Sequence, residues 1–202
     1  MKWIARKIST VFILPVWGLY GLARLFLSQN RAFADTTQGL SLLPGIVGEY
    51  CRLAFFRQVL GSCGKDACIG FGTIFSHATV EIGERVYVGP YCILGDVTLG
   101  DDVLLASGVS IANGTRQHGI RRLDIPIREQ PGEYPRIHIG KDTWIGERAI
   151  VLADVGEHCV IGAGALVLEP IPDYAIAVGV PARVVQDRRE NAGKFGLEKS
   201  PI

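Results

Sequence analysis

A hydrophobic residue recurs at every sixth position through much of the second half of the chain. Glycine or alanine usually follows it directly, and a small or β-branched residue stands four positions later. Helices repeat every 3.6 residues and amphipathic strands every two, so neither element alone has this period. A short strand followed by a tight turn does fit, and stacked coils of such units bury a continuous core. The positions are Ile82, Val88, Leu94, Leu99, Leu105 and Ile111, then Ile139, Ile145, Val151, Ile161 and Val167.

The repeat stops for about twenty residues between Thr115 and Arg136. An interruption of this length inside a compact domain is usually functional or disordered. Three prolines and many charged residues indicate an extended excursion rather than an inserted helix, and His118 lies within it among arginines. We therefore predict a functional loop over residues 113–137.

The N-terminal pattern is different, because residues 8–27 are largely apolar and the first 31 residues carry five cations and no acidic residue. We predict that residues 1–34 form a membrane-associating segment, with Trp3, Trp17 and Tyr20 at headgroup depth. A spanning helix, a signal peptide cleaved after "AFA" (32–34) and a soluble packing helix remain alternatives. Residues 35–66 are predicted to be a helical packing region, with Leu53, Phe56 and Leu60 on one face.

Composition and charge narrow the function classes. The formal net charge is +1 and the pI is about 7.7, which gives no reason to expect nucleic acid as a partner. The 25 glycines are explained by the repeat. The five cysteines, at positions 51, 63, 68, 92 and 159, form no CxxC pair, and we interpret them as buried thiols in a reduced compartment.

The units "IGERVY", "VGPYCI", "LGDDVL", "IGKDTW", "IGERAI" and "IGAGAL" resemble the hexapeptide-repeat superfamily. The resemblance covers residues 67–185 and implies an all-β domain, a left-handed parallel β-helix with three units in each triangular coil. It also implies a homotrimer with active sites in clefts between subunits. Residues 186–202 are predicted to form a charged C-terminal tail.

The interruption resembles the acyltransferase branch of this superfamily, which includes galactoside, maltose and polysaccharide O-acetyltransferases. The loop "NGTRQHGIRRLDIP" leads into "PRIHIGKDTWIG", and "IPDYAIAVGVPARVV" resembles the closing segment. The resemblance implies acetyl-CoA as acyl donor and His118 as general base, a role worth about 10²–10⁴ in rate. Family loops often place the histidine directly after Ser or Thr, whereas Arg116 and Gln117 intervene here.

Further site residues follow from the same resemblance. The candidates for binding the acceptor or orienting the imidazole are Asn113, Arg116 and Asp124. Small residues would let the pantetheine arm approach the backbone, and an arginine would meet the nucleotide phosphates. The candidates for this cofactor site are Trp144, Gly146, Ala163, Gly164 and Arg183.

We therefore expect acetyl transfer to a hydroxyl of a sugar, in a glycan or polysaccharide precursor, on the cytoplasmic side of the cytoplasmic membrane. Three alternatives stay open: a sugar N-acetyltransferase, a zinc-dependent carbonic-anhydrase-like β-helix and a non-catalytic scaffold. Zinc-binding β-helices of the carbonic-anhydrase type typically place two histidine ligands in an H-x4-H pair. The histidines at 77, 118, 138 and 158 contain no such pair, so we expect no metal. The role of His77 is left open.

Overall fold

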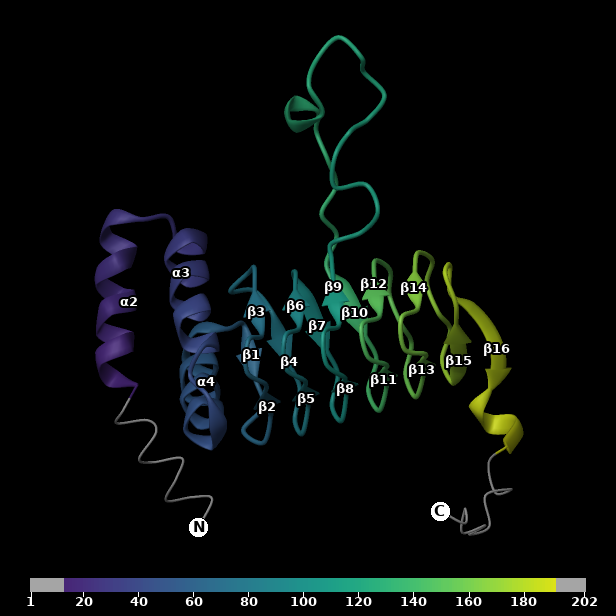
Figure 1. Ribbon diagram of the computed structural model, residues 1–202, viewed down its shortest axis with the longest axis horizontal. Coiled ribbons are helices and arrows are strands. Elements are labelled where there is room, and N and C mark those ends of the chain that lie inside the picture. Colours follow the sequence, from purple (N-terminus) through teal and green to yellow (C-terminus); the bar gives the residue numbers. More distant parts are fainter. Residues whose placement is uncertain (1–12, 192–202) are drawn as a thin grey trace.

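Short parallel strands wind into a triangular solenoid that three helices cover at its N-terminal end (Figure 1). This computed structural model describes residues 13–191; Trp3, the cations at 2, 6 and 7, and residues 192–202 lie outside the described residues. The solenoid has three sheets, which we call A, B and C in the order in which the chain visits them. Sheet A contains β1 (Ser62–Cys63), β4 (Glu81–Ile82), β7 (Val97–Leu99) and β10 (Ile137–Ile139).

The other two sheets complete each coil. Sheet B contains β2 (Cys68–Ile69), β5 (Tyr87–Val88), β8 (Leu104–Leu105), β11 (Trp144–Ile145), β13 (Val160–Ile161), β15 (Ala175–Val178) and β16 (Arg183–Asp187). Sheet C contains β3 (Ile74–Phe75), β6 (Ile93–Leu94), β9 (Ser110–Ile111), β12 (Ile150–Val151) and β14 (Leu166–Val167). All pairings are parallel except that of β15 with β16.

The predicted period-six positions form the core of the solenoid. Along sheet B, for example, Val88 pairs with Leu105 and Leu105 with Ile145, so equivalent residues stack from coil to coil. Every residue of the predicted set is at most 2% exposed. Burial of this continuous column is the main stabilising contribution, at roughly 25 cal/mol per Å² of apolar surface removed from water. The predicted parallel β-helix is confirmed.

The glycines that follow these positions permit close contact between coils. A Cβ atom on Gly140 would lie 2.4 Å from the backbone nitrogen of Glu157, and one on Gly146 would lie 2.5 Å from that of Ala163. Real Cβ atoms do not approach a neighbouring backbone so closely, so a larger residue would force the coils apart. The glycine of the repeat is therefore a packing requirement.

Three corners join the sheets, and we name each by the two sheets that it connects. Corner AB contains a stack of non-glycine residues with positive φ, one in each coil after the first, whereas corner BC combines two such residues, Tyr91 and Arg148, with positive-φ glycines. Corner CA has no comparable series among the described non-glycine residues, and the long loop leaves the solenoid here, between β9 and β10. The stack at corner AB consists of Arg85, Asp102, Asp142, His158 and Tyr174.

The helical cap consists of α2 (Leu14–Phe26), α3 (Gln29–Ser41) and α4 (Gly45–Val59). The Ser28 side chain accepts a hydrogen bond from the Arg31 backbone N–H and caps α3, as expected for an N-cap serine. Edge-to-face aromatic contacts continue from Tyr20 through Phe55 and Phe56 to Phe75 in the first coil. The cap and the solenoid therefore share one core.

A buried arginine fixes the cap to the first coil. Arg52 is 2% exposed and donates from Nε to the Ile69 carbonyl (2.9 Å) and from Nη1 to the carbonyls of Leu43 (2.7 Å) and Leu40 (3.4 Å). Arg52 thereby joins the end of α3 and the turn that follows it to β2. Burial lowers the pKa of Arg52 from its ordinary value.

Some predicted boundaries differ from the observed ones. The division at residues 34 and 35 falls inside α3, and the first strand begins at Ser62 rather than at residue 67. Leu53 and Phe56 are buried against the body, as predicted for the helical region, and Leu60 is half-buried. Ala32 and Phe33, from the suggested cleavage site, are buried in the core. Loss of residues 1–34 would remove α2 and part of α3 from this cap.

Within residues 13–191, the structure contains no helix that is both long enough and apolar enough to cross a bilayer.

Candidate functional site

The long loop projects away from the solenoid between β9 and β10 (Figure 1). Its base is closed by Asn113, which is 6% exposed. The Asn113 side chain accepts a hydrogen bond from the Asp96 N–H (3.1 Å) and donates to the carbonyls of Asp96 (2.9 Å) and Pro135 (3.0 Å). The Asn113 amide thus connects the outgoing and returning segments of the loop to the preceding coil at Asp96.

An arginine holds the returning strand from its other side. Arg136 Nη1 lies 2.8 Å from Glu81 Oε1, Nε lies 3.2 Å from Asp96 Oδ2, and Nη2 donates to the Thr79 carbonyl (2.8 Å). The hydrogen bond to Asp96 raises the pKa of Arg136. Because Arg136 is only partly exposed, these charge-assisted hydrogen bonds fix the point at which the chain re-enters the solenoid.

A cavity of about 400 Å³ opens at corner CA beside the base of the loop. Arg116 forms an ion pair with Glu133 (3.3 Å) across the two strands of the loop. Two guanidinium groups and three carboxylates line the cavity together with small and aliphatic residues, which suits a ligand rich in hydroxyl groups. The lining residues are Gly114, Thr115, Arg116, Glu133, Pro135, Arg136, Ile137, Leu152, Ala153, Asp154, Leu168, Glu169 and Pro170.

His118 lies further out on this loop and is exposed. Its ring makes no hydrogen bond or ion pair with any other residue of the described part of the chain. Its backbone is nevertheless constrained, because a Cβ atom on Gly132 would lie 1.9 Å from the Gln117 carbonyl oxygen and 3.0 Å from the His118 nitrogen. Gly132 thus lets the two strands of the loop close directly beside His118.

The outer part of the loop is held by a second buried amide. Gln130, 6% exposed, donates to the Arg122 carbonyl (2.7 Å) and accepts from the Arg122 N–H (3.1 Å). Asp124 forms a two-point ion pair with Arg122, and the hydrogen bond from this arginine lowers the pKa of Asp124. The carboxylate that we predicted to bind substrate is therefore already paired within the loop.

The predicted cofactor residues lie on other parts of the solenoid surface. Trp144 is 52% exposed on β11 and lines a smaller cavity of about 190 Å³ at corner AB. Ala163 and Gly164 are exposed at corner BC, where Gly164 has φ +66° and no atom near the position of a Cβ. Gly146 contacts the next coil rather than open surface.

Arg183 is exposed on β16, with Nη1 donating to the Ala182 carbonyl (2.9 Å). Within one chain the structure does not bring the five predicted cofactor residues to the cavity beside the loop.

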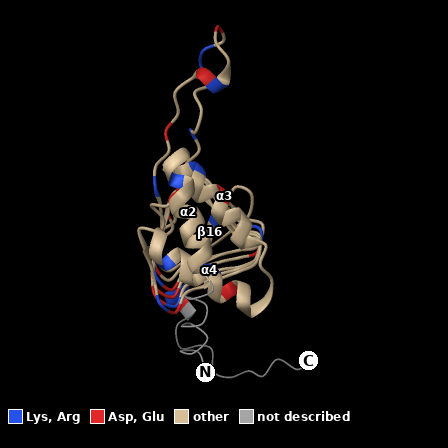
Figure 2. Cartoon of the chain, turned by 90° about the vertical axis from the view of Figure 1, so that its left-hand side faces the viewer, with Lys and Arg blue, Asp and Glu red and all other residues tan. Residues whose placement is uncertain are grey.

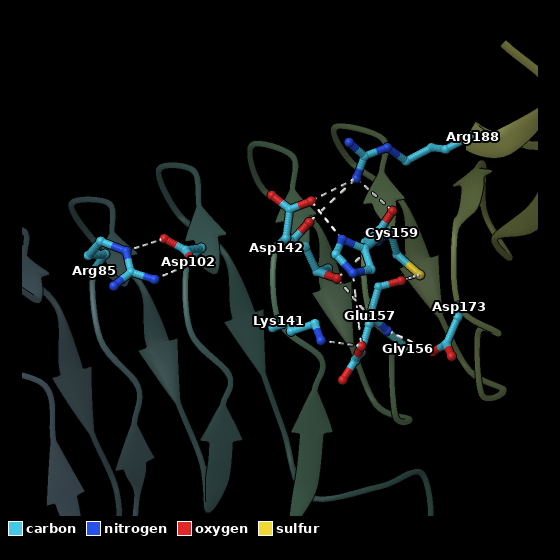
Figure 3. A network of polar contacts seen from close by, with 11 residues as sticks. Arg85, Asp102, Lys141, Asp142, Gly156, Glu157, Cys159, Asp173 and Arg188 are labelled. Atoms are coloured by element: carbon cyan, nitrogen blue, oxygen red, sulfur yellow. Dashed lines mark hydrogen bonds and ion pairs between the residues drawn. The ribbon is translucent and has the colours of Figure 1, made fainter. Parts of the chain in front are cut away.

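A polar network supports the smaller cavity. Asp142 Oδ2 lies 2.8 Å from His158 Nδ1, and the His158 ring stacks on Tyr174 at 4.8 Å between centroids. Figure 3 shows Arg188 reaching from beyond β16 to this corner, where Nη1 donates to the His158 carbonyl (2.7 Å). The segment that closes the solenoid is thus fastened across the last coils.

Cysteine and metal chemistry have little support in the described residues. All five cysteines are free, and burial raises the pKa of Cys63 and that of Cys68 to about 12. A reactive cysteine needs the opposite shift, which argues against a nucleophilic role for Cys63 and Cys68. Within residues 13–191 no group of three or more His, Cys, Asp and Glu side chains is placed to hold a metal ion. His77 Nδ1 is buried without a hydrogen-bond partner among the described residues.

Sequence reasoning missed most of the cavity wall. Asp154, Glu169 and Glu133 face the cavity, yet each stands in a turn or loop where acidic residues are common. Arg136 contacts Glu81, 55 residues earlier in the chain, and no local pattern signals such a pair. Only the coil register places these side chains beside the loop.

Two profiles of hexapeptide repeats match the chain. Residues 79–113 match the profile described as bacterial transferase hexapeptide (six repeats), and residues 136–169 match that of the hexapeptide repeat of succinyl-transferase. The two matches flank the long loop. A solved maltose O-acetyltransferase from Clostridium difficile 630 superposes with a TM-score of 0.67 at 26% identity, covering 80% of this chain and 89% of that one.

Three relatives of known sequence are described as acetyl- or acyltransferases. A probable acetyltransferase of Mycobacterium tuberculosis is 37% identical over 58% of this chain, which spans 40% of that relative's length. Galactoside O-acetyltransferase of Escherichia coli K12 is 30% identical over 67% of this chain and 68% of its own length. A dTDP-4-amino-4,6-dideoxy-D-glucose acyltransferase of Escherichia coli is 30% identical over 78% of this chain and 89% of its own.

Proposed function

Because the chain belongs to the hexapeptide-repeat acetyltransferase family, we propose that it transfers an acetyl group from acetyl-CoA to a hydroxyl group of a sugar. The observation that carries the proposal is the loop holding His118, which leaves the solenoid beside a polar cavity and between the two matched repeat segments. The scaffold alternative gives no reason for an exposed histidine on a loop fastened by two buried amides.

In the proposed reaction the His118 imidazole accepts the proton of the sugar hydroxyl as its oxygen attacks the thioester carbonyl. A C–O bond forms and the tetrahedral intermediate expels the CoA sulfur. The imidazolium then returns the proton to the thiolate, so that CoA leaves as a thiol. Backbone N–H groups at the coil corners would stabilise the oxyanion, a contribution that is often worth about 10²–10³ in rate.

The acceptor we propose is a sugar of a glycan or polysaccharide precursor at the cytoplasmic face of the cytoplasmic membrane. The cavity supports this class, because Arg116, Glu133 and Asp154 offer donors and acceptors for several hydroxyl groups at once. An amino sugar is the second candidate, favoured by the similarity to the dTDP-amino-sugar acyltransferase. A base such as His118 serves either nucleophile.

We also propose that the working unit is a homotrimer. The loop stands clear of the solenoid (Figure 1), whereas the residues predicted for acetyl-CoA lie at other corners of the same chain. A neighbouring subunit that brings one of those corners to the loop would complete the site. Light scattering of the purified chain is expected to give three times 21.9 kDa, and a mass of 21.9 kDa at assay concentration would contradict this prediction.

The donor can be tested before the acceptor is known. We expect excess acetyl-CoA to stabilise the folded protein by about 2.7 kcal/mol at 100 times its Kd. For a chain of this size that corresponds to a rise of about 5–10 °C in the unfolding midpoint. Thermal unfolding with acetyl-CoA, and with free acetate as control, measures the effect. No shift at millimolar acetyl-CoA would contradict the proposal.

The acceptor class is then decided by comparing the turnover of candidate acceptors. A panel of neutral sugars and amino sugars, with CoA release as readout, separates O-transfer from N-transfer. Preferential turnover of an amino sugar over its hydroxyl analogue would replace the first candidate by the second.

A further inference from the structure

Helix α2 exposes apolar side chains around most of its circumference. It touches the body through a narrow stripe in which Tyr20 is buried and Val16 and Ala23 are half-buried. A helix that is apolar all round is normally covered on every side, so the outer face of α2 lacks a partner in the single chain. The exposed residues are Leu14, Trp17, Leu19, Leu22, Leu25 and Phe26, of which Phe26 is 81% exposed.

A second exposed apolar group follows α3. Leu42 and Leu43 lie in the turn between α3 and α4, and Ile46 and Val47 lie in the first turn of α4. Helices α2 and α3 run antiparallel and side by side (Figure 1), so this turn lies at the same end of the pair as the start of α2. Figure 2 shows this face of the molecule with few charged residues on the three helices. We call both groups together the helical apolar surface.

The charges of the helical region are mostly positive: residues 1–60 contain seven Lys and Arg residues and two acidic ones, Asp35, which pairs with Arg31, and Glu49. The first 31 residues contain five cations and no acidic residue, and Arg24 and Arg31 flank the link between α2 and α3. A second copy of the chain on the same surface would bring two such cationic segments together, which is unfavourable. An anionic lipid surface would instead attract each cation by about 1 kcal/mol.

The length of α2 determines how the helix could contact a bilayer. Its 13 residues span about 20 Å, which is shorter than the roughly 30 Å hydrocarbon core of a bilayer. We propose that the helical apolar surface docks onto an anionic bilayer, with α2 lying in the plane of the headgroup region and Trp17 at its polar boundary. This inference goes beyond the proposed acetyl transfer and does not depend on it.

The test uses the full chain and vesicles without acetyl-CoA or acceptor, so its result is independent of the enzymatic proposal. The protein is expected to sediment with vesicles of phosphatidylcholine and phosphatidylglycerol, less with phosphatidylcholine alone, and less as salt is raised. Protein that stays in the supernatant with both kinds of vesicle would overturn the proposal.

A pair of variants identifies the surface. In Leu22→Ser/Phe26→Ser, two side chains on one face of α2 lose their apolar character, and the partition coefficient is expected to fall at least about tenfold. Val184→Ser/Val185→Ser removes two exposed apolar residues from β16 and is expected to leave binding unchanged. Equal unfolding midpoints of both variants and the parent chain establish that the fold is intact.

Two outcomes would overturn the assignment. Undiminished binding by the α2 variant would place the lipid contact elsewhere. If neither protein binds vesicles and light scattering shows that the parent forms a larger assembly than the α2 variant does, the surface is an interface between copies of the chain.

Discussion

Replacement of His118 by alanine is expected to lower the turnover number for acetyl transfer by about 10²–10⁴, because the imidazole is the proposed acceptor of the hydroxyl proton. The unfolding midpoint should not change, since the side chain is exposed and makes no hydrogen bond or ion pair with the described residues. The measurement is CoA release with the best acceptor from the sugar panel. The stabilisation by acetyl-CoA should persist, because it reports donor binding.

The control for this experiment lies in the same loop. Leu123 is 97% exposed, and Leu123→Ala alters the loop surface without removing an ionisable group. We expect its turnover number to stay within about twofold of the parent, as surface substitutions away from special features have small effects. A His118→Ala variant that turns over as fast as Leu123→Ala would refute a catalytic role for His118.

Replacement of Asn113 by alanine is expected to lower the free energy of unfolding by about 3–4 kcal/mol. The change removes three hydrogen bonds at the base of the loop, which the buried Asn113 amide makes with the half-buried Asp96 and with Pro135. Each hydrogen bond of this kind contributes about 0.5–1.5 kcal/mol to stability. Urea denaturation measures the loss, and turnover should fall as well, because the loop that carries His118 is no longer held.

Gln117→Ala is the matched control for Asn113. This side chain donates one hydrogen bond of 3.3 Å to the Gly114 carbonyl and is half-buried, so its loss should cost less than about 1 kcal/mol. If Asn113→Ala were equally mild, the loop would have to be held mainly by Arg136 instead, and the importance given to the amide would be wrong.

The solenoid could be predicted from the sequence because each six-residue repeat contains the pattern that specifies its own strand and turn. Val88, Leu105 and Ile145 each point inward for the same reason, and the coil register then follows from the spacing. The position of the loop could also be predicted, because the six-residue repeat is interrupted there. The predicted loop over residues 113–137 follows β9, which ends at Ile111, and its last residue is the first of β10.

The contacts of the predicted site residues could not be predicted, because the six-residue spacing does not show which side chains meet at a corner. Asn113 was predicted to meet substrate or to orient the histidine, and the structure gives its amide three hydrogen bonds within the chain. Gly146 was predicted to give a ligand access to the backbone, whereas it gives access to the next coil. In both cases the sequence indicates the property of the residue but not its neighbours within the chain, because neighbours at a corner are set by coils about 17 residues apart.

The two ends of the solenoid are closed by different means. Helices α3 and α4 cover the first coil, while β16 turns back antiparallel to β15 and the segment before it covers the edge of sheet C, with Ala182 N–H donating to the Leu166 carbonyl. A stack of parallel strands without such covers would present free edges at both ends and could add further copies indefinitely. The fold therefore prevents growth along its own axis. Side-to-side contacts between solenoids need no free strand edge, and they form a ring when the rotation between neighbouring copies closes.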